Sequence, residues 1–377
     1  MPIIIKEVQS KKELCAFIKF PFKLYKHSKY YVPPLISKEM KTLDKRKNPA
    51  FEFCEARYWM AFRDNVIVGR IAGIFNYAIN KKYDKTFIRF GWFDFIEDQD
   101  VVNALLFEVE KWGIEKNAEM VNGPLGFISF DPTGVLVEGF DEIPTSYATY
   151  NYPYYDKLIK NYGYVKDADW IEFNIKVPER MPEKILKVSA LIKERYKLRN
   201  LEFTTKNEAL KYTDLLFNLL NDIYGDLPGY IKLTPAVKDN IMKELNSLFL
   251  PDYLSIIINE KDEPVAFGIV TPSISGALQK ARGKLFPLGL FYILKAIKSH
   301  KVADLLLIGV RPDYQNKGVH SIIFEKNLQS LINHKVKEVE VTRTLENNSK
   351  LTNIWGPYEY RQHKRARCYV KQLNYSV

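Results

Sequence analysis

The stretch Asp304-Leu-Leu-Leu-Ile-Gly-Val-Arg-Pro-Asp-Tyr-Gln-Asn-Lys-Gly-Val-His-Ser-Ile-Ile323 predicts a strand, a tight loop and the start of a helix. The apolar run from Leu305 to Ile308 is typical of a strand that is buried on both faces. Pro312 ends this strand, because proline cannot donate a hydrogen bond to a sheet. A helical pattern of apolar residues then runs from 319 to 333.

The loop Gln315-Asn-Lys-Gly318 is the candidate binding site in this stretch. Such a loop points free backbone N–H groups outward at a helix N-terminus, where the helix dipole also favours an anion. Gly318 leaves room for a phosphate to approach the backbone, and Lys317 adds a positive charge. These features predict a pyrophosphate site with coenzyme A as its ligand, although an ordinary strand–turn–helix connection with one glycine has the same spacing.

The composition indicates a globular protein of a reducing compartment. The chain has 377 residues, enough for two domains, and 46% of them are hydrophobic. The net charge is +11, but the lysines are spread along the chain, so we expect an anionic cofactor or substrate and no nucleic acid. Cys15, Cys54 and Cys368 have no metal-binding or redox spacing, so no metal site is predicted. Without a recognisable signal peptide or membrane span, we expect a cytoplasmic protein.

The order of predicted elements is repeated in the two halves of the chain. Each half contains a β-hairpin, a strand, a helix, a second strand, a short helix and a pair of closing strands. The closing pairs fall at 164–177 and 358–373, whereas 128–150 is predicted as a loop. Two prolines mark a linker in Val177-Pro-Glu-Arg-Met-Pro182. We therefore predict an N-terminal domain at 1–178, a linker and helix at 179–199, and a C-terminal domain at 200–377.

This order resembles the GNAT superfamily, the Gcn5-related N-acyltransferases. The central loop of that family has Gln or Arg, two free positions, Gly, one free position, and then Gly or Ala. Gln315 and Gly318 match this pattern, and His320 stands at the small-residue position. The likeness covers about residues 200–373. The first half has Ile96-Glu-Asp-Gln-Asp100 instead, and its three acids would repel a pyrophosphate, so we expect a GNAT-like domain that lacks the cofactor loop.

The whole chain is also similar to bacterial proteins of tandem GNAT layout, through residues 90–95, 151–155 and 360–365. The resemblance implies an α/β (α+β) fold of two tandem GNAT-like domains, each a mixed, mostly antiparallel, twisted sheet flanked by helices. It implies acetyl-CoA or a longer acyl-CoA as the cofactor. The residues that would hold this cofactor are Ile308, Gly309 and Val310 at the thioester, and Gln315, Asn316, Lys317, Gly318, Val319 and Asn348.

Attack of an amine on a thioester needs a proton acceptor and a proton donor. The resemblance implies a Tyr as the acid, several residues after an Asn; Trp355 falls at that place, so Tyr358 is the candidate. The candidate bases are His320 beside the loop, whose ordinary pKa is about 6.5, His363, and Glu340 on the predicted strand at 336–342. Each also has a structural explanation, namely packing at an element end or a solvent-facing strand position.

The basic run at 361–367 is a candidate substrate site. Strand alternation predicts Arg361, His363, Arg365 and Arg367 on one face and Lys364 on the other. Such a face would bind an anionic group of the substrate through Arg361, His363 and Arg365. A solvated or edge-protecting face would have the same pattern.

The segment 285–297 is apolar nearly all round and has lysine and arginine on both sides. A buried helix is the first expectation. A lid over a long acyl chain, or docking on a membrane surface, is the alternative.

Together these observations predict an acyl-CoA-dependent N-acyltransferase, with acetyl-CoA as the first expectation. Its acceptor would be a small-molecule amine or amino-acid-like substrate bound in the cleft between the two domains. The alternative is a non-catalytic module of the same fold that binds CoA or another anion.

Overall fold

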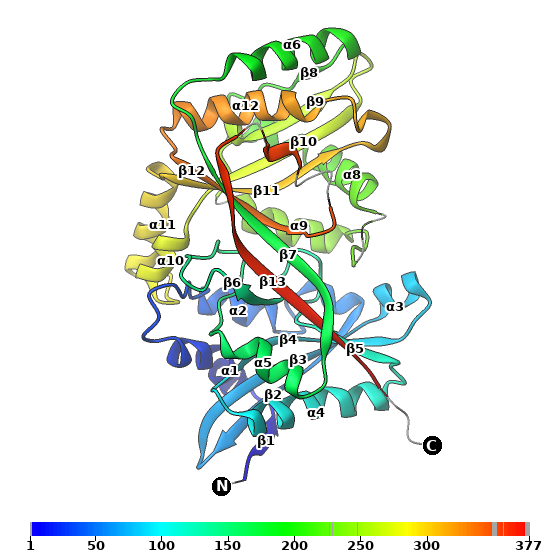
Figure 1. The fold of residues 1–377 in the computed structure, drawn as a ribbon, viewed down its shortest axis with the longest axis vertical. Coiled ribbons are helices and arrows are strands. Elements are labelled where there is room, and N and C mark those ends of the chain that lie inside the picture. The colour runs from blue at the N-terminus through cyan, green and yellow to red at the C-terminus, as the bar shows by residue number, and fades with distance from the viewer. Residues whose placement is uncertain are drawn as a thin grey trace.

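The structure is a computed structural model that describes residues 2–225, 227, 229–246, 248–348, 353–356 and 358–373. Thirteen strands of this part of the chain form one continuous sheet, in the order β1-β2-β3-β4-β5-β13-β7-β12-β11-β10-β9-β8, and β6 pairs with β13 off this path. Helices lie on the faces of the sheet in both halves of the molecule (Figure 1). The predicted mixed, mostly antiparallel architecture is confirmed.

The first half of the sheet contains a meander followed by a parallel pair. The strands β1 to β4 pair antiparallel in chain order, and β4 then pairs parallel with β5. The strands are β1 (Ile4–Glu7), β2 (Cys54–Arg63), β3 (Val66–Asn76), β4 (Phe87–Phe95), β5 (Met120–Gly123), β6 (Val135–Glu138) and β7 (Val165–Lys176). The helices are α1 (Lys11–Leu24), α2 (Ile36–Thr42), the 3₁₀ turn η1 (Pro49–Glu52), α3 (Tyr77–Tyr83), α4 (Gln99–Glu115) and α5 (Tyr154–Asn161).

The second half repeats this arrangement. Its strands β8 to β11 pair antiparallel in chain order, and β11 pairs parallel with β12. The strands are β8 (Arg199–Asn200), β9 (Leu254–Ile258), β10 (Pro264–Pro272), β11 (Val302–Val310), β12 (Glu338–Leu345) and β13 (Tyr360–Gln372). The helices are α6 (Glu183–Tyr196), α7 (Lys206–Leu210), α8 (Thr213–Tyr224), α9 (Pro235–Asn246), α10 (Ser275–Ala281), α11 (Leu288–Lys298), α12 (His320–Asn333), and the 3₁₀ turns η2 (Pro251–Tyr253), η3 (Pro312–Tyr314) and η4 (Asn353–Trp355).

The two halves are joined by their closing strands, β7 and β13. The last strand, β13, lies between β5 and β7 of the first half, and β7 in turn pairs with β12 of the second half. Figure 1 shows both strands running through the middle of the molecule. This pairing joins the two halves through backbone hydrogen bonds, so one continuous sheet forms the floor of the space between them. The predicted boundaries at 178 and 200 stay a prediction.

Three local predictions were wrong. Each predicted closing pair is one long strand, because β7 and β13 pair with each other along most of their lengths and need no internal turn. The predicted loop at 128–150 contains β6, which finds its partner only in the distant β13. The segment 285–297 is not a buried helix, because α11 packs through one face only and leaves Phe291 and Leu294 exposed. The predicted short helix at 348–355 is described only in part, since 349–352 lie outside the described residues.

The apolar cores follow the repeated order of elements. In the first half, α4 packs its apolar face, including Leu105, Val109 and Trp112, against β2, β3 and β4. In the second half, Ile322 and Ile323 of α12 pack against β9 and β10. Among the described helices, none combines the length and the apolar character that crossing a membrane would require.

Candidate active site

The parallel strands β11 and β12 pair at their N-terminal ends and then diverge in the middle of the sheet. They pair only from Val302–Leu305 with Glu338–Val341. Beyond this point β11 continues beside β10, while β12 turns toward β7. The Thr342 hydroxyl donates to the carbonyls of Leu305 and Leu306, at 3.1 and 3.0 Å, where the strands part. The β12-facing edge of residues 306–310 is therefore left without a neighbouring strand.

The predicted phosphate loop lies directly after β11. Asn316 and Gly318 adopt positive φ angles of 59° and 74°, so the backbone curls before α12 begins. The N–H groups of residues 316–319 donate to no backbone carbonyl of the described residues, and no side chain caps α12. Lys317 lies over the rings of Tyr196 and Tyr314. The loop thus presents free donors and a cation at one helix start, which suits an anionic group.

The matching position of the first half has a different arrangement. The Asp98 carboxylate caps α4 by accepting from the N–H groups of Asp100 and Val101, at 3.0 and 3.3 Å. The same carboxylate forms an ion pair with Arg63 at 2.7 Å. A phosphate at the start of α4 would be repelled by the Asp98 carboxylate, which already occupies the free N–H groups of this helix.

A cavity of about 630 Å³ extends from the opening between β11 and β12 into the space between the two halves. Its near end includes the β11 segment 305–308 and the β12 segment 341–345. Its middle is lined by apolar side chains of α8, α9 and the sheet, among them Leu216, Leu220, Ile241, Leu245, Ile269 and Leu307. The size and lining suit a long hydrocarbon chain better than a compact polar molecule.

The far end of the cavity lies in the first half and is polar. Arg70 binds Asp94 with Nε to Oδ2 at 2.8 Å, and the Tyr25 hydroxyl donates to Asp94 Oδ1 at 2.7 Å. The hydroxyls of Tyr25 and Tyr155 are 2.6 Å apart. All four side chains line the cavity. Sequence reasoning missed this group, because its members come from the residue after α1 and from β3, β4 and α5.

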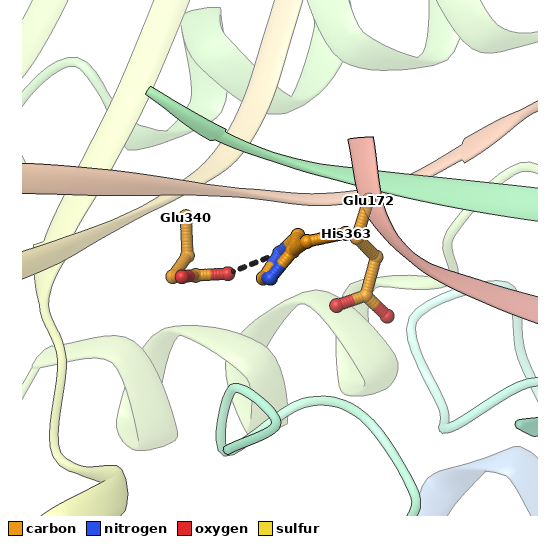
Figure 2. Close-up of side chains that lie close together, drawn as sticks. All are labelled: Glu172, Glu340 and His363. Carbon is orange, nitrogen blue, oxygen red and sulfur yellow. Dashed lines mark ion pairs between the residues drawn. The ribbon is translucent and has the colours of Figure 1, made fainter. Parts of the chain in front are cut away.

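A cluster of charged side chains lies beside the opening, on β7, β12 and β13 (Figure 2). Glu340 Oε2 is 2.8 Å from His363 Nε2 and 3.3 Å from the Lys364 ammonium. The same ammonium is 3.2 Å from Glu172 Oε2, and Arg343 Nε is 2.9 Å from Glu172 Oε1. Burial acts to raise the pKa values of Glu340 and Glu172, but the surrounding cations hold both pKa values below the ordinary range. Glu340 is therefore a weak base.

The side chains of Glu172, Glu340 and His363 place ligand atoms within 4.8 Å of one another, close enough for a metal ion. Lys364 lies against both carboxylates, however, and its side chain is only 1% exposed. Its ammonium already supplies the positive charge that a metal ion would bring. The cluster is explained as a buried ion-pair network.

The predicted alternation along 361–367 was wrong. A β-bulge at His363 shifts the register with β7, because Gln362 pairs with Phe173 and Lys364 with Glu172. As a result, His363 and Lys364 both reach Glu340. Arg365 and Arg367 instead bind Asp169.

The guanidinium groups of the predicted substrate site are already paired. Arg361 forms two hydrogen bonds with Glu142, at 2.6 and 3.0 Å. Arg365 binds Asp169 at 3.1 Å and Glu138 at 3.0 Å. Recognition of an anionic substrate by Arg361, His363 and Arg365 stays a prediction, and it would require these pairs to exchange partners.

Asp304 is the titratable residue at the base of the opening that sequence reasoning left without a role. It is fully buried, and its carboxylate lies beside the Ser273 side chain, with no other hydrogen-bonding side chain against it among the described residues. Its strand neighbours are Thr271 and Glu340, and the Thr271 hydroxyl lies beside the Tyr147 hydroxyl. Burial raises the pKa of Asp304 to about 7. A carboxyl group with this pKa can accept a proton at neutral pH.

The other predicted catalytic residues lie around Phe324 of α12. The rings of His320 and Tyr358 are both 5.7 Å from Phe324, and Trp355 is 5.4 Å away. Burial lowers the pKa of His320 and raises the pKa of Tyr358 above its ordinary value. Like Asp304 and Glu340, neither side chain lines the cavity. Their catalytic roles stay predictions.

The predicted cofactor residues are distributed along the opening and the loop. Ile308 and Asn348 line the cavity, and the Ile308 carbonyl accepts a hydrogen bond from Tyr224 at 3.0 Å. Gln315 Nε2 donates to the Val310 carbonyl at 3.1 Å, which ties the loop to the end of β11. Gly309 packs against Phe267, where a Cβ would be 2.7 Å from the ring. Their contacts with a cofactor stay predictions.

We expect Gly318→Ala to weaken CoA binding by roughly tenfold, because a positive φ disfavours alanine and a Cβ would narrow the loop beside Ile192. Isothermal titration with CoA measures the effect. Gly163→Ala is the matched control, since Gly163 also has a positive φ and lies away from the loop. Equal affinities of the two variants would contradict a phosphate site at this loop.

The comparisons with known proteins agree with the fold described above. No family model matches the chain. The chain is 27% identical to Protein YghO of Escherichia coli over 98% of this chain and 95% of that protein, and 24% identical to the bacterial ceramide synthase of Caulobacter vibrioides over 97% and 96%. Among solved structures, it is similar to a tandem GNAT protein from the clavulanic acid biosynthesis pathway, with a TM-score of 0.58, 11% identity and 100% of both chains covered. Over its whole length, the chain therefore has the tandem GNAT fold.

Proposed function

We propose that this protein is an acyl-CoA-dependent N-acyltransferase whose acceptor is an amine with a long hydrocarbon chain. The observation that carries this proposal is the apolar cavity that begins where β11 and β12 separate. In a GNAT fold this opening is where an acyl thioester is expected. The similarity to the ceramide synthase of Caulobacter vibrioides, at 24% identity, supports an amine acceptor of lipid character.

The loop residues 315–319 would hold the pyrophosphate, and the free edge of β11 would hold the thioester arm. The acceptor would lie in the cavity, with its hydrocarbon chain along Leu216, Leu220 and Leu245. This arrangement brings donor and acceptor together at residues 305–308. It also keeps the reacting carbonyl away from bulk water, which would otherwise compete with the amine.

The reaction needs only proton transfers from the protein. The amine nitrogen attacks the thioester carbon, the new C–N bond forms, and the C–S bond breaks as the thiolate leaves. Asp304 is buried behind the cavity wall, so it accepts the proton that the amine loses through a relay past Tyr147, which lines the cavity and interacts with Asp304. Glu340 is less suited to this role, because its surrounding cations keep its carboxylate weakly basic.

The direct test mixes the purified protein with a long-chain amine and either acetyl-CoA or palmitoyl-CoA, and measures released thiol and the amide product by mass spectrometry. We expect one amide formed for each CoA released. Binding of CoA without transfer to any amine of a panel would support the non-catalytic module instead. No binding of any acyl-CoA would contradict both.

We expect Leu245→Trp to reduce kcat/KM for long-chain acceptors by roughly tenfold relative to short ones, because the larger ring takes up cavity volume. Leu245 is half-buried on α9, so the substitution does not require repacking of a closed core. Leu186→Trp is the control, since Leu186 is exposed on α6 outside the cavity. An unchanged chain-length preference would contradict this placement of the acceptor.

A further inference from the structure

The helical hairpin of α10 and α11 exposes a compact group of apolar side chains. Of the seventeen large apolar side chains that are exposed in the described part of the chain, four lie between positions 286 and 294. Phe286 is 69% exposed, Leu288 58%, Phe291 59% and Leu294 55%. We call this group the apolar face. Figure 1 shows α10 and α11 at one edge of the molecule.

The apolar face lies on the side of α11 that does not pack against the rest of the protein. A Cβ on Gly289 of α11 would be 2.0 Å from the Lys284 carbonyl oxygen and 3.1 Å from the Ala281 side chain, and Ile293 joins a core with Leu278 of α10 and with Ile274, which directly precedes α10. These contacts use the inner side of α11. The outer side meets no described residue that could cover it, although exposed apolar groups of this density are unfavourable in water.

Positive charge surrounds the apolar face. The segment from 273 to 301 contains six lysine or arginine residues and no aspartate or glutamate, although the whole chain has 45 acidic residues. All six are exposed, and none forms an ion pair within the described part of the chain. They are Lys280, Arg282, Lys284, Lys295, Lys298 and Lys301.

We propose that this hairpin docks the protein on the surface of an anionic phospholipid bilayer. Apolar side chains would enter the boundary of the acyl chains, while the cations would lie at the level of the anionic headgroups. Charge complementarity favours a bilayer over a second copy of the chain. A symmetric contact between two such hairpins would place twelve positive groups together without a single acid from either segment.

The hairpin lies next to the cavity, so docking would bring the cavity close to the bilayer. This part of the inference rests on the proposed function. Leu278 of α10 and Ile274, directly before that helix, line the cavity, and α10 packs against α11. The bilayer surface would therefore lie one helix layer from the acceptor site. A long-chain amine or its amide product could then pass between lipid and cavity with little exposure to water.

Vesicle flotation tests the docking. The full chain is mixed with vesicles of phosphatidylcholine alone or of phosphatidylcholine with phosphatidylglycerol. We expect binding to the anionic vesicles only, and weaker binding when NaCl is raised from ~0.1 M to ~0.5 M. The double variant Phe291→Ser/Leu294→Ser should lose binding by roughly tenfold or more. Lys295→Gln/Lys298→Gln should weaken it as well, whereas Leu191→Ser, which changes an exposed leucine of α6, should leave it unchanged.

Three results would overturn the docking inference: no binding to anionic vesicles, equal binding of the Phe291→Ser/Leu294→Ser variant, or self-association that this variant abolishes while vesicles stay unbound. The last result would assign the apolar face to a second copy of the chain. Acyl transfer measured in detergent separates the two proposals. Transfer that persists without vesicle binding removes docking alone, and vesicle binding without transfer removes the proposed function alone.

Discussion

Replacement of Asp304 by asparagine is expected to lower acyl transfer by about 100-fold or more while leaving CoA binding intact. The amide has the shape of the carboxyl group but cannot accept the proton from the attacking amine. Single-turnover rates with saturating acyl-CoA measure the chemical step, and titration with CoA shows that the cofactor site survives. A rate within threefold of the parent protein would remove Asp304 from the proton transfer.

The pH dependence of the rate follows from the same residue. Because burial raises the pKa of Asp304 to about 7, the active carboxylate is lost as the pH falls below 7, and the rate should fall with it. Asp304→Asn should abolish this acidic limb. Glu340→Gln should keep it, since the pKa of Glu340 lies below the ordinary value. If Glu340→Gln loses the limb and Asp304→Asn keeps it, Glu340 is the base.

Asp304→Asn should lower the rate of acyl transfer but raise the free energy of unfolding. A carboxyl group whose folded pKa is raised stabilises the fold below its ordinary pKa of 3.8, and this contribution is lost as the pH rises through about 7. At pH 8, Asp304→Asn removes the buried charge and should raise the free energy of unfolding by up to roughly 4 kcal/mol. Denaturant titration at pH 5 and pH 8 checks that the gain is larger at the higher pH.

Lys364→Met is expected to lower the free energy of unfolding by roughly 3–5 kcal/mol. Lys364 and Glu172 are each 1% exposed, and removal of the ammonium takes the shared cation from two carboxylates, which keep Arg343 at Glu172 and His363 at Glu340 as close partners. Methionine fills a similar volume, so the effect reports lost charge pairing more than lost packing. Urea titration of both proteins measures it.

The control for Lys364→Met is Lys371→Met on the same strand. Lys371 binds Glu110 at 3.0 Å but is 29% exposed, so water can replace the lost partner and the change should be about 1 kcal/mol or less.

Lowered folded pKa values give Glu172 and Glu340 a stabilising contribution above the ordinary pKa of 4.5, and it is lost as the pH falls through the folded values. The difference between parent and Lys364→Met should therefore shrink below about pH 4.5. Equal destabilisation by both variants would contradict the buried network.

Much of the fold could be predicted from local patterns. The apolar run at 305–308, Pro312 and the helical spacing from 319 located β11, η3 and α12 within a few residues. The repeated order of elements indicated two similar halves, and the solved tandem GNAT structure shares this fold. Such features are readable because strand, turn and helix preferences act between residues close in the chain.

The candidate site was predicted less completely, because its members meet through long-range pairing. Asp304 stands in the stretch that led to the fold prediction, yet its pKa is raised by burial within the assembled sheet and, to a smaller extent, by Glu340 of the neighbouring strand. The polar end of the cavity combines Tyr25, directly after α1, with residues of β3, β4 and α5. No spacing in the sequence marks these groups as neighbours.

The sequence by itself determined most of the elements, though not β6 or the unbroken closing strands, together with their repeated order and the glycine loop at 315–318, since these depend on local spacing. Only the tertiary structure decided that β13 enters the first half, that the bulge at His363 turns Lys364 toward Glu340, and that α11 leaves its apolar face exposed. The physical reason is that partner choice and burial depend on the whole sheet. A one-residue shift of register moves every following side chain to the other face, and nothing local to the strand reports it.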